Sequence, residues 1–200
     1  MVAGGRGTRF GDRKQYLRLG DERVLDRSLR AAAGVSDGVV LVVPEDMADR
    51  AEPGADQVVA GGDTRSASVR AGLAAVPDDA MVIVVHDAAR PLARAEVWRR
   101  VLEAVSAGAD AAVPAVAVTD TLRALGGGTV AREGLVAVQT PQAFRAEALR
   151  SAHAAGAEAT DDASLVEASG GRVVVVDGDP SNIKITTPTD LALAELLCRG

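Results

Sequence analysis

Residues 81–91 read MVIVVHDAARP, in which five apolar residues are followed at once by a histidine, an acid and, shortly after, an arginine and a proline. An unbroken apolar run of this kind is typical of a strand that is buried on both faces of a parallel sheet. In α/β folds, ligands bind at the carboxyl ends of such strands. The stretch therefore predicts an α/β fold with a ligand site that begins near Asp87.

The rest of the chain repeats this pattern, because short apolar runs alternate with segments whose apolar residues have helical spacing. We predict strands at residues 39–43, 57–60, 81–85, 111–118 and 172–176. We predict helices at residues 25–33, 66–75, 95–107, 146–155, 163–168 and 189–197. The last helix has the clearest start, with Thr187 as N-cap, Pro188 at the first helical position and Asp190 in the first turn. The alternation indicates one α/β domain over residues 1–200, with a parallel sheet covered by helices.

Residues 119–138 depart from this alternation. They contain three consecutive glycines, residues 126–128, between two weakly alternating segments at 121–125 and 129–131. A glycine-rich reversal that is too short to hold a crossover helix is better explained as a projecting β-arm than as another layer of the sheet. Such an arm favours contact with a partner subunit, and a disordered surface loop is the alternative.

The composition excludes several classes of function. The chain has 200 residues, of which 48% are hydrophobic and 25% charged, and this suits one domain with a buried core. Its net charge of −6 and its aromatic content of 2% disfavour binding to nucleic acid or to an anionic membrane. Cys198 is the only cysteine, which excludes an internal disulfide and a cysteine-rich metal site. Because no apolar run approaches the roughly 20 residues of a membrane span, we expect a soluble cytoplasmic protein.

The stretch GGRGTR, residues 4–9, is followed closely by Lys14, so that a glycine-rich turn lies beside cations. Glycine tolerates positive φ angles and lets backbone N–H groups approach an anion, while Arg9 and Lys14 carry positive charge to phosphate oxygens. The stretch therefore predicts a phosphate site. A plain turn or helix C-cap with solvated arginines is the alternative.

Two further segments combine acids and hydroxyls at predicted helix starts, namely GGDTRSAS at residues 61–68 and TDDAS at residues 160–164. Free N–H groups at the start of a helix bind a phosphate or a base carbonyl, and Ser or Thr hydroxyls add to them. Ordinary N-capping explains both segments equally well. The sequence leaves a binding role and a structural role open for each.

The polar residues after the quoted apolar run have specific chemical uses. Asp87 suits a sugar hydroxyl, a substrate cation or magnesium, and Arg90 suits a phosphate or a carboxylate that locks the loop. We interpret His86, and likewise His153 in an alanine-rich helical stretch, as structural rather than catalytic. Lys184 interrupts an apolar strand pattern, and a buried ammonium without an anion is costly. We therefore expect Lys184 to face a ligand or a carboxylate.

Several stretches of the chain, each weakly specific alone, occur together in a specific order. They span residues 3–9, 14–17, 61–68, 85–91, 120–121, 139–142, 160–164 and 182–186. In this order they resemble the cytidylyltransferases that join CTP to 2-C-methyl-D-erythritol 4-phosphate in the non-mevalonate isoprenoid pathway. The resemblance covers nearly the whole chain. It implies a Rossmann-like fold and a homodimer in which the β-arm is exchanged between subunits.

In that family a phosphate oxygen of the polyol attacks the α-phosphorus of CTP and releases pyrophosphate. The resemblance implies that Arg9 and Lys14 stabilise the charge of the transition state, while Arg132 and Lys184 position the attacking phosphate. Arg132 would act in the neighbouring subunit's site together with Thr121. The residues that line the polyol phosphate pocket would be Asp87, Arg90, Thr121 and Thr140. The residues that recognise cytidine and ribose would be Ala3, Gly4, Gly5, Gly62, Asp63, Arg65, Ser68 and Ala88.

The resemblance also implies a magnesium ion (Mg2+), held mainly through the phosphates of CTP, with Asp87 as the nearest protein carboxylate and no dedicated protein metal site. Two features differ from the family pattern. Only Met1 and Val2 precede Ala3, where members have a full apolar strand, so we expect a weakly anchored central strand. The link before Lys14 is short, and we expect errors in the placement of Lys14 to slow the reaction.

Alternative functions remain open at this point. A cytidylyltransferase for ribitol 5-phosphate shares nearly all of these motifs and differs in the polyol pocket. A nucleotide-binding domain without turnover is the alternative from another class. A purely structural or interaction protein is disfavoured, because the phosphate-suited segments at strand ends would then be coincidental.

Overall fold

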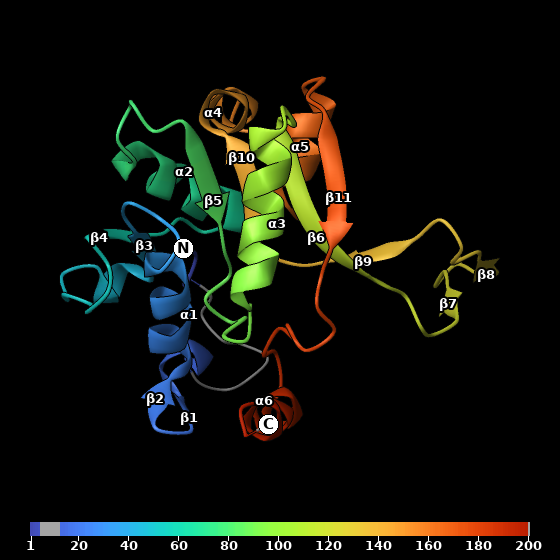
Figure 1. The fold of residues 1–200 in the computed structure, drawn as a ribbon, viewed down its shortest axis with the longest axis horizontal. Helices are drawn as coiled ribbons and strands as arrows, with labels where there is room; N and C mark the ends of the chain where they lie inside the picture. The colour runs from blue at the N-terminus through green and yellow to red at the C-terminus, as the bar shows by residue number, and fades with distance from the viewer. Residues whose placement is uncertain (5–12, 200) are drawn as a thin grey trace.

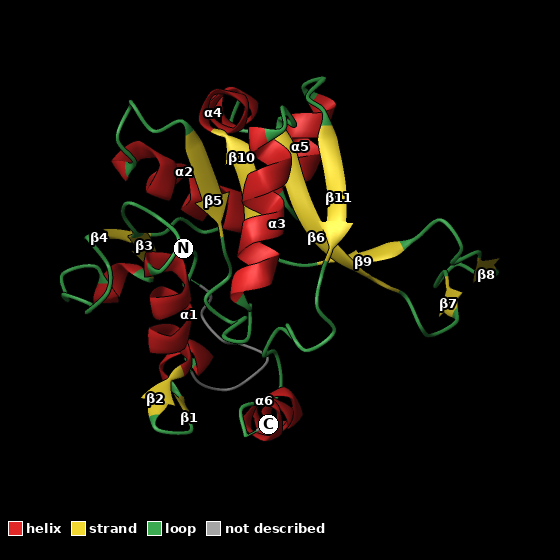
Figure 2. Ribbon diagram, in the orientation of Figure 1, coloured by secondary structure: helices red, strands yellow, loops and turns green. Residues whose placement is uncertain are grey.

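A twisted sheet runs through the molecule and carries helices on both faces (Figures 1 and 2). The computed structural model describes residues 1–4 and 13–199. The strands of this sheet are β3 (Val40–Val43), β4 (Gln57–Ala60), β5 (Val82–Val85), β6 (Ala111–Ala117), β10 (Gln142–Arg145) and β11 (Val173–Asp177). All five predicted strands are present and differ from their predicted bounds by at most one residue at either end.

The sheet has a mostly parallel arrangement, as predicted. β3 pairs with β4 and β6 with β11 in parallel register. The exceptions are β10, which lies between β5 and β6 and is antiparallel to both, and β9 (Val136–Val138), which is antiparallel to β6. The sequence analysis missed β10, because its four residues include Gln142 and Arg145 and show no apolar run.

The N-terminal residues join the two halves of the sheet. Val2 forms parallel bridges to Val42 on one side and to Asp87 on the other. The Val2 amide donates to the carbonyl of His86 at 2.8 Å, and the Ala3 amide donates to the carbonyl of Val42 at 2.7 Å. The expected weak anchoring at Ala3 is therefore wrong, since even this short segment bonds to both neighbours.

The helices follow the predicted pattern. They are α1 (Val24–Ala33), α2 (Arg65–Ala75), α3 (Ala95–Ser106), α4 (Ala146–Ala154), α5 (Asp162–Ala168) and α6 (Pro188–Leu197). The shorter elements are the 3-10 helices η1 (Lys14–Tyr16) and η2 (Glu45–Met47) and the hairpin strands β1 (Arg18–Leu19) and β2 (Glu22–Arg23). The predicted cap of α6 is confirmed, because the Thr187 side chain accepts from the Asp190 amide and Asp190 bonds back to Thr187.

Alternating residues of the strands separate the two faces of the sheet. Ile83 and Val85 of β5 belong to the apolar core that includes residues of α2, α4 and α5. Val84 packs instead against the cores on the face of α1 and α3. α6 lies away from the sheet (Figure 1) and packs with β1 in a small core that includes Leu19 and Ala194. Within the residues that the structure describes, no helix is long and apolar enough to cross a membrane.

The predicted β-arm at 119–138 is present and projects from the end of β6 (Figure 1). β7 (Leu122–Arg123) pairs antiparallel with β8 (Thr129–Val130), and β9 (Val136–Val138) returns along β6. Gly127 and Gly128 form the reversal with φ angles of 109° and 83°, which other residues rarely adopt. The hairpin is confirmed, whereas its part in a dimer stays a prediction.

Candidate active site

Asp87 follows the last residue of β5 and lies at the centre of a group of charges. The Nζ atom of Lys184 is 2.5 Å from its Oδ2 atom, and Nε of Arg65 is 3.8 Å from its Oδ1 atom. Burial alone would raise the pKa of Asp87, but Lys184 and Arg65 outweigh burial and lower it below its usual value. Asp87 is therefore an ionised carboxylate at neutral pH, and the predicted carboxylate partner of Lys184 is confirmed. We call the group of Asp87, Arg65, Thr140 and Lys184 the sheet-edge site.

His86 is buried beneath this site and bonded at both ring nitrogens. Its Nε2 atom is 3.1 Å from the carbonyl oxygen of Arg90, and its Nδ1 atom is 3.1 Å from Oγ1 of Thr140. A carbonyl only accepts, so Nε2 carries the proton and Nδ1 accepts from the Thr140 hydroxyl. Burial lowers the pKa of His86 to about 3. The structural interpretation of His86 is confirmed, because a neutral imidazole with both nitrogens engaged has no capacity left to act as a base.

Thr140 and Asn182 hold the Lys184 segment against the end of β5. The Asp87 amide donates to Oγ1 of Thr140 at 3.0 Å, and Nδ2 of Asn182 donates to the Thr140 carbonyl at 2.9 Å. The Ile185 amide donates to the carbonyl of Ala89 at 2.8 Å. The segment 182–186 is thus held by these bonds and forms no strand, although its apolar pattern resembles one.

Arg90 joins the Lys184 segment to the root of the arm. Its Nη1 atom donates to the carbonyl of Asn182 at 2.6 Å, and its Nη2 atom lies 3.5 Å from the carbonyl oxygen of Val138. The predicted lock through a carboxylate is therefore wrong, since the partners are backbone carbonyls. Arg90 fixes two loops that both border the sheet-edge site.

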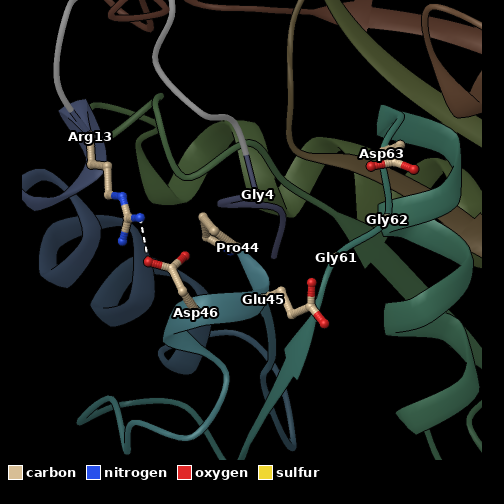
Figure 3. Close-up of a pocket in the computed structure, with 8 residues that line it drawn as sticks. All are labelled: Gly4, Arg13, Pro44, Glu45, Asp46, Gly61, Gly62 and Asp63. Atoms are coloured by element: carbon tan, nitrogen blue, oxygen red, sulfur yellow. Dashed lines mark hydrogen bonds and ion pairs between the residues drawn. The ribbon is translucent and has the colours of Figure 1, made fainter.

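A cavity of about 370 Å³ lies beside the sheet-edge site (Figure 3). Its lining residues are Gly4, Arg13, Pro44, Glu45, Asp46, Gly61, Gly62 and Asp63. Arg13 and Asp46 form an ion pair of 2.5 Å at one side of it. The predicted nucleotide residues Gly4, Gly62 and Asp63 therefore share one cavity, whose volume is in the range of small-molecule sites.

Close packing explains two glycines of this cavity, Gly61 and Gly62. A Cβ atom on Gly61 would lie 2.8 Å from Oγ of Ser68, and one on Gly62 would lie 2.5 Å from Cβ of Ala67. A Cβ atom on Gly4 would lie 3.4 Å from the same Ser68 oxygen. None of these three glycines has a positive φ angle. Positive φ therefore does not explain Gly4, and the 3.4 Å separation from Ser68 is an ordinary contact that leaves room for a side chain.

The comparisons with known proteins agree with this geometry. The sequence model of the family described as IspD, 2-C-methyl-D-erythritol 4-phosphate cytidylyltransferase, matches residues 1–199. The chain belongs to this family. The members of this family are nucleotidyltransferases.

Individual relatives match nearly the whole of this chain. The 2-C-methyl-D-erythritol 4-phosphate cytidylyltransferase of Rhodococcus jostii (strain RHA1) is 46% identical, over 98% of this chain and 92% of the relative. The bifunctional enzyme IspD/IspF of Paracoccus denitrificans (strain Pd 1222) is 45% identical over 98% of this chain and 54% of its own length. The crystal structure of the Thermus thermophilus enzyme superposes with a TM-score of 0.86 at 39% identity, covering 100% of this chain and 97% of that one.

Most of the residues that the family resemblance implicated are brought together in the described part of the chain. Those at or beside the carboxyl ends of the strands are Ala3, Gly4, Gly62, Asp63, Arg65, Ser68, Asp87, Ala88, Arg90, Thr140 and Lys184. Lys14 is the first residue of η1, next to Arg13 of the cavity. Gly5, Arg9 and most of the link before Lys14 lie outside the described residues.

Two implicated residues are not part of this group within one chain. Thr121 and Arg132 lie on the arm, which projects away from the sheet (Figure 1). Both are exposed, and Nη1 of Arg132 donates to the carbonyl of Thr119 on the arm itself. The chain alone does not bring these side chains to the sheet-edge site.

The sequence analysis also missed residues that shape the family's site here. Gln15 donates to the Ala3 carbonyl at 2.8 Å from a buried position, and Asp46 pairs with Arg13. Gln15 lies in the stretch 14–17 that carries the family resemblance, so the sequence could have indicated it. Asp46 lies in none of these stretches. From the sequence, Asp162 is only part of an acidic helix start. The structure adds its pairing with Arg65, because its Oδ2 atom is 2.8 Å from Nη1 of Arg65.

Proposed function

We propose that this chain transfers the cytidylyl group of CTP to 2-C-methyl-D-erythritol 4-phosphate, which gives 4-diphosphocytidyl-2-C-methyl-D-erythritol and pyrophosphate. The observation that carries the proposal is the family match over residues 1–199, joined to the cluster of cations and glycines at one edge of the sheet. The attacking group is a phosphate oxygen, which is already anionic. The reaction therefore needs no protein nucleophile, in agreement with the neutral and fully bonded His86.

Lys184 is the residue that we propose to hold the attacking phosphate. An ammonium group has three N–H donors, and Asp87 accepts at one of them. The Lys184 side chain is 41% exposed, so the remaining donors are open to a ligand. Because Asp87 fixes the ammonium before the substrate binds, the positive charge is preorganised for the acceptor phosphate.

The stabilisation of charge on the transferred phosphoryl group is assigned to Lys14 and Arg9. Positioned cations supply most of the catalysis in such a reaction, because charge accumulates on non-bridging oxygens. The position of Lys14 next to Arg13, which lines the cavity, supports this role. The cytidine and ribose are assigned to the cavity that Gly4, Gly62 and Asp63 line.

We further propose that the chain acts as a homodimer in which the arm of one subunit completes the site of the other. The projection of the arm supports this, since the arm, which carries Thr121 and Arg132, extends away from the sheet (Figure 1). The arm also exposes apolar side chains that a partner would cover, namely Leu125, Val130, Leu135, Val136 and Val138. Arg132 would then help Lys184 to position the acceptor phosphate.

Magnesium is proposed to bind through the triphosphate rather than through a protein cluster. In the described residues, no three His, Cys, Asp or Glu side chains are grouped so as to hold a metal ion. Both oxygens of Asp87 already lie beside cations, so this carboxylate fits at most a peripheral contact. When bound, the ion would neutralise charge on the phosphates of CTP.

The alternatives differ in what supports them. The family model and the relatives cited above carry the methylerythritol phosphate name, which favours this acceptor over ribitol phosphate. A domain without turnover would follow from a weak central strand or from a short link that misplaces Lys14. The hydrogen bonds of Val2 and Ala3 argue against the first cause, and most of the link lies outside the described residues. A cytoplasmic location stays a prediction, which cell fractionation tests.

The test is pyrophosphate release from CTP and magnesium with one acceptor at a time. We expect release with 2-C-methyl-D-erythritol 4-phosphate and background levels with ribitol 5-phosphate or without acceptor. Release with ribitol 5-phosphate alone would replace the proposal with the alternative acceptor. Calorimetric binding of CTP without any release would establish a binding domain instead.

A further inference from the structure

A buried carboxylate lies behind Arg65 and joins three helices. Asp162, in the first turn of α5, has 0% exposure. Its Oδ1 atom is 2.9 Å from Nε2 of His153 on α4, and its Oδ2 atom is 2.8 Å from Nη1 of Arg65 on α2. Oδ1 is thus in hydrogen-bond contact with His153, whereas Oδ2 meets Arg65 as an ion pair without hydrogen-bond geometry, and the two partners come from different helices.

This arrangement extends the charges of the sheet-edge site into the interior. Positive and negative groups alternate in the order Lys184, Asp87, Arg65 and Asp162, with separations of 2.5 Å, 3.8 Å and 2.8 Å. Arg65 lies between two carboxylates and is closer to the buried one. Asp87 in turn lies closer to Lys184 than to Arg65, so the contact between Arg65 and Asp87 is the longest of the three.

Removal of the negative charge of Asp162 would change which carboxylate pairs with Arg65. Arg65 would lose its nearest anion, and the carboxylate of Asp87 lies 3.8 Å from its Nε atom. A guanidinium makes paired bonds with a carboxylate more readily than a single ammonium does. Asp87 would then be shared between Arg65 and Lys184, and the hold on Lys184 would weaken.

We propose that Asp162 is a positioning residue that acts through Arg65. It holds the guanidinium back from Asp87, so that Asp87 stays paired with Lys184 and Arg65 stays at the nucleotide side of the site. His153 fixes the orientation of the Asp162 carboxylate by bonding its other oxygen. The inference rests on the proposed function, because it takes the roles of Arg65 toward cytidine and of Lys184 toward the acceptor phosphate from there.

The experiment compares Asp162→Asn with Asp161→Ala. Asp161 is the N-cap of the same helix and accepts from the Ser164 amide at 3.1 Å, so its loss weakens α5 without touching Arg65. For Asp162→Asn we expect the KM values for both CTP and the acceptor phosphate to rise about tenfold, with a smaller change in kcat. For Asp161→Ala we expect a Tm lower by a few degrees and unchanged KM values. A lower Tm with unchanged KM values in Asp162→Asn would overturn the inference.

A second pair of variants tests whether the effect passes through Arg65. We expect the single variant Arg65→Gln and the double variant, which adds Asp162→Asn, to agree in kcat/KM within about twofold. Without Arg65, the change at Asp162 has no guanidinium left to release. The double variant removes the buried carboxylate and its partly exposed cationic partner together, so it leaves neither charge unpaired and covers the case in which Asp162→Asn alone fails to fold. A double variant far less active than Arg65→Gln would overturn the inference.

The two proposals fail in different ways. If the unaltered chain turns over and Asp162→Asn matches it, the positioning role fails while the proposed function stands. If the unaltered chain binds CTP without turnover, the Kd for CTP replaces KM, and an equal Kd in Asp162→Asn counts against the role. If the unaltered chain does not bind CTP, the proposed function fails and the inference falls with it.

Discussion

The sheet-edge site and the arm differ in how far their side chains are buried and how many partners they have within the same chain. Asp87 and Thr140 are buried, and each has partners in the same chain. On the arm, Leu125 is fully exposed, and the described bond of Arg132 goes to a backbone carbonyl of the arm itself. The first region is preorganised by one chain. The second has the apolar and cationic surface of a segment that a partner would cover.

This contrast divides the catalytic work between two kinds of structure. Charges that must stay fixed during the reaction are held by buried hydrogen bonds at the ends of strands. In the proposed dimer, the residues that reach the second subunit are carried on the arm, which projects away from the sheet (Figure 1). Variants in the two regions are therefore expected to fail in different measurements.

The largest effect is expected for Lys14→Ala, which changes the body of the chain and leaves the arm intact. Loss of one positioned cation at the transferred phosphoryl group should lower kcat by about 100- to 1,000-fold. The circular dichroism spectrum should be unchanged. Arg18→Ala is the matched control, because Arg18 is an exposed cation near Lys14 that bonds to the Asp21 carbonyl. Near-normal kcat in Lys14→Ala would remove the assigned role.

Arg132→Ala changes the arm and leaves the body intact. A lost charge-assisted contact with the acceptor phosphate should lower kcat/KM for that substrate by about 10- to 100-fold, mainly through KM. The KM for CTP should stay close to that of the unaltered chain. Arg123→Ala on β7 of the same arm is the control. If both arm variants behave alike, the effect of Arg132 belongs to the hairpin as a whole and its specific role is wrong.

Val136→Ser tests the apolar surface of the arm. Val136 is 48% exposed in one chain, and its burial in a dimer would contribute free energy that serine does not supply. We expect the dimer Kd to rise at least about tenfold, measured by sedimentation over a range of concentrations. Val175→Ser is the control, because Val175 is 59% exposed on β11, away from the arm. Equal Kd values for the two variants would argue against an arm-mediated dimer.

The smallest effect concerns the pH dependence of stability. Burial lowers the pKa of His86 from 6.5 to about 3, so between these values the unfolded state binds more protons than the folded state. The free energy of unfolding therefore falls as the pH drops below about 6.5, by up to about 1.4 kcal/mol per pH unit from this group. His86→Gln should show a shallower fall between pH 6.5 and 5 in denaturant titrations. Parallel slopes for the two proteins would contradict the buried neutral state of His86.

The sequence alone predicted most of the fold, because the deciding signals are local. The helices have apolar residues at helical spacing, and β5 is an unbroken apolar run. The cap of α6 lies within four neighbouring residues. The arm was predicted from its consecutive glycines, two of which have the positive φ angles of the reversal.

The missed features depend on contacts between distant segments. β10 has no apolar run and is a strand because β5 and β6 pair with it on both sides. The pairs of Arg13 with Asp46 and of Arg65 with Asp162 join segments that only the fold brings together. Gly61 and Gly62 belong to a motif that the sequence indicated. The reason for glycine there is packing against α2, which only the structure shows. Local patterns thus predicted the elements and the motifs, while ion pairs across the fold required the structure.

The most direct test of a site shared between body and arm is to mix the Lys14→Ala and Arg132→Ala proteins after dissociation and reassociation. In a mixed dimer, one site combines an intact body with an intact arm and the other site carries both changes. At equal amounts, random pairing and an acceptor concentration well below its KM, where both parent variants are nearly inactive, the account predicts recovery of about a quarter of the activity of the unaltered protein. No recovery, with subunit exchange proven by mass-labelled chains, would mean that each site is built within one chain and would contradict the account.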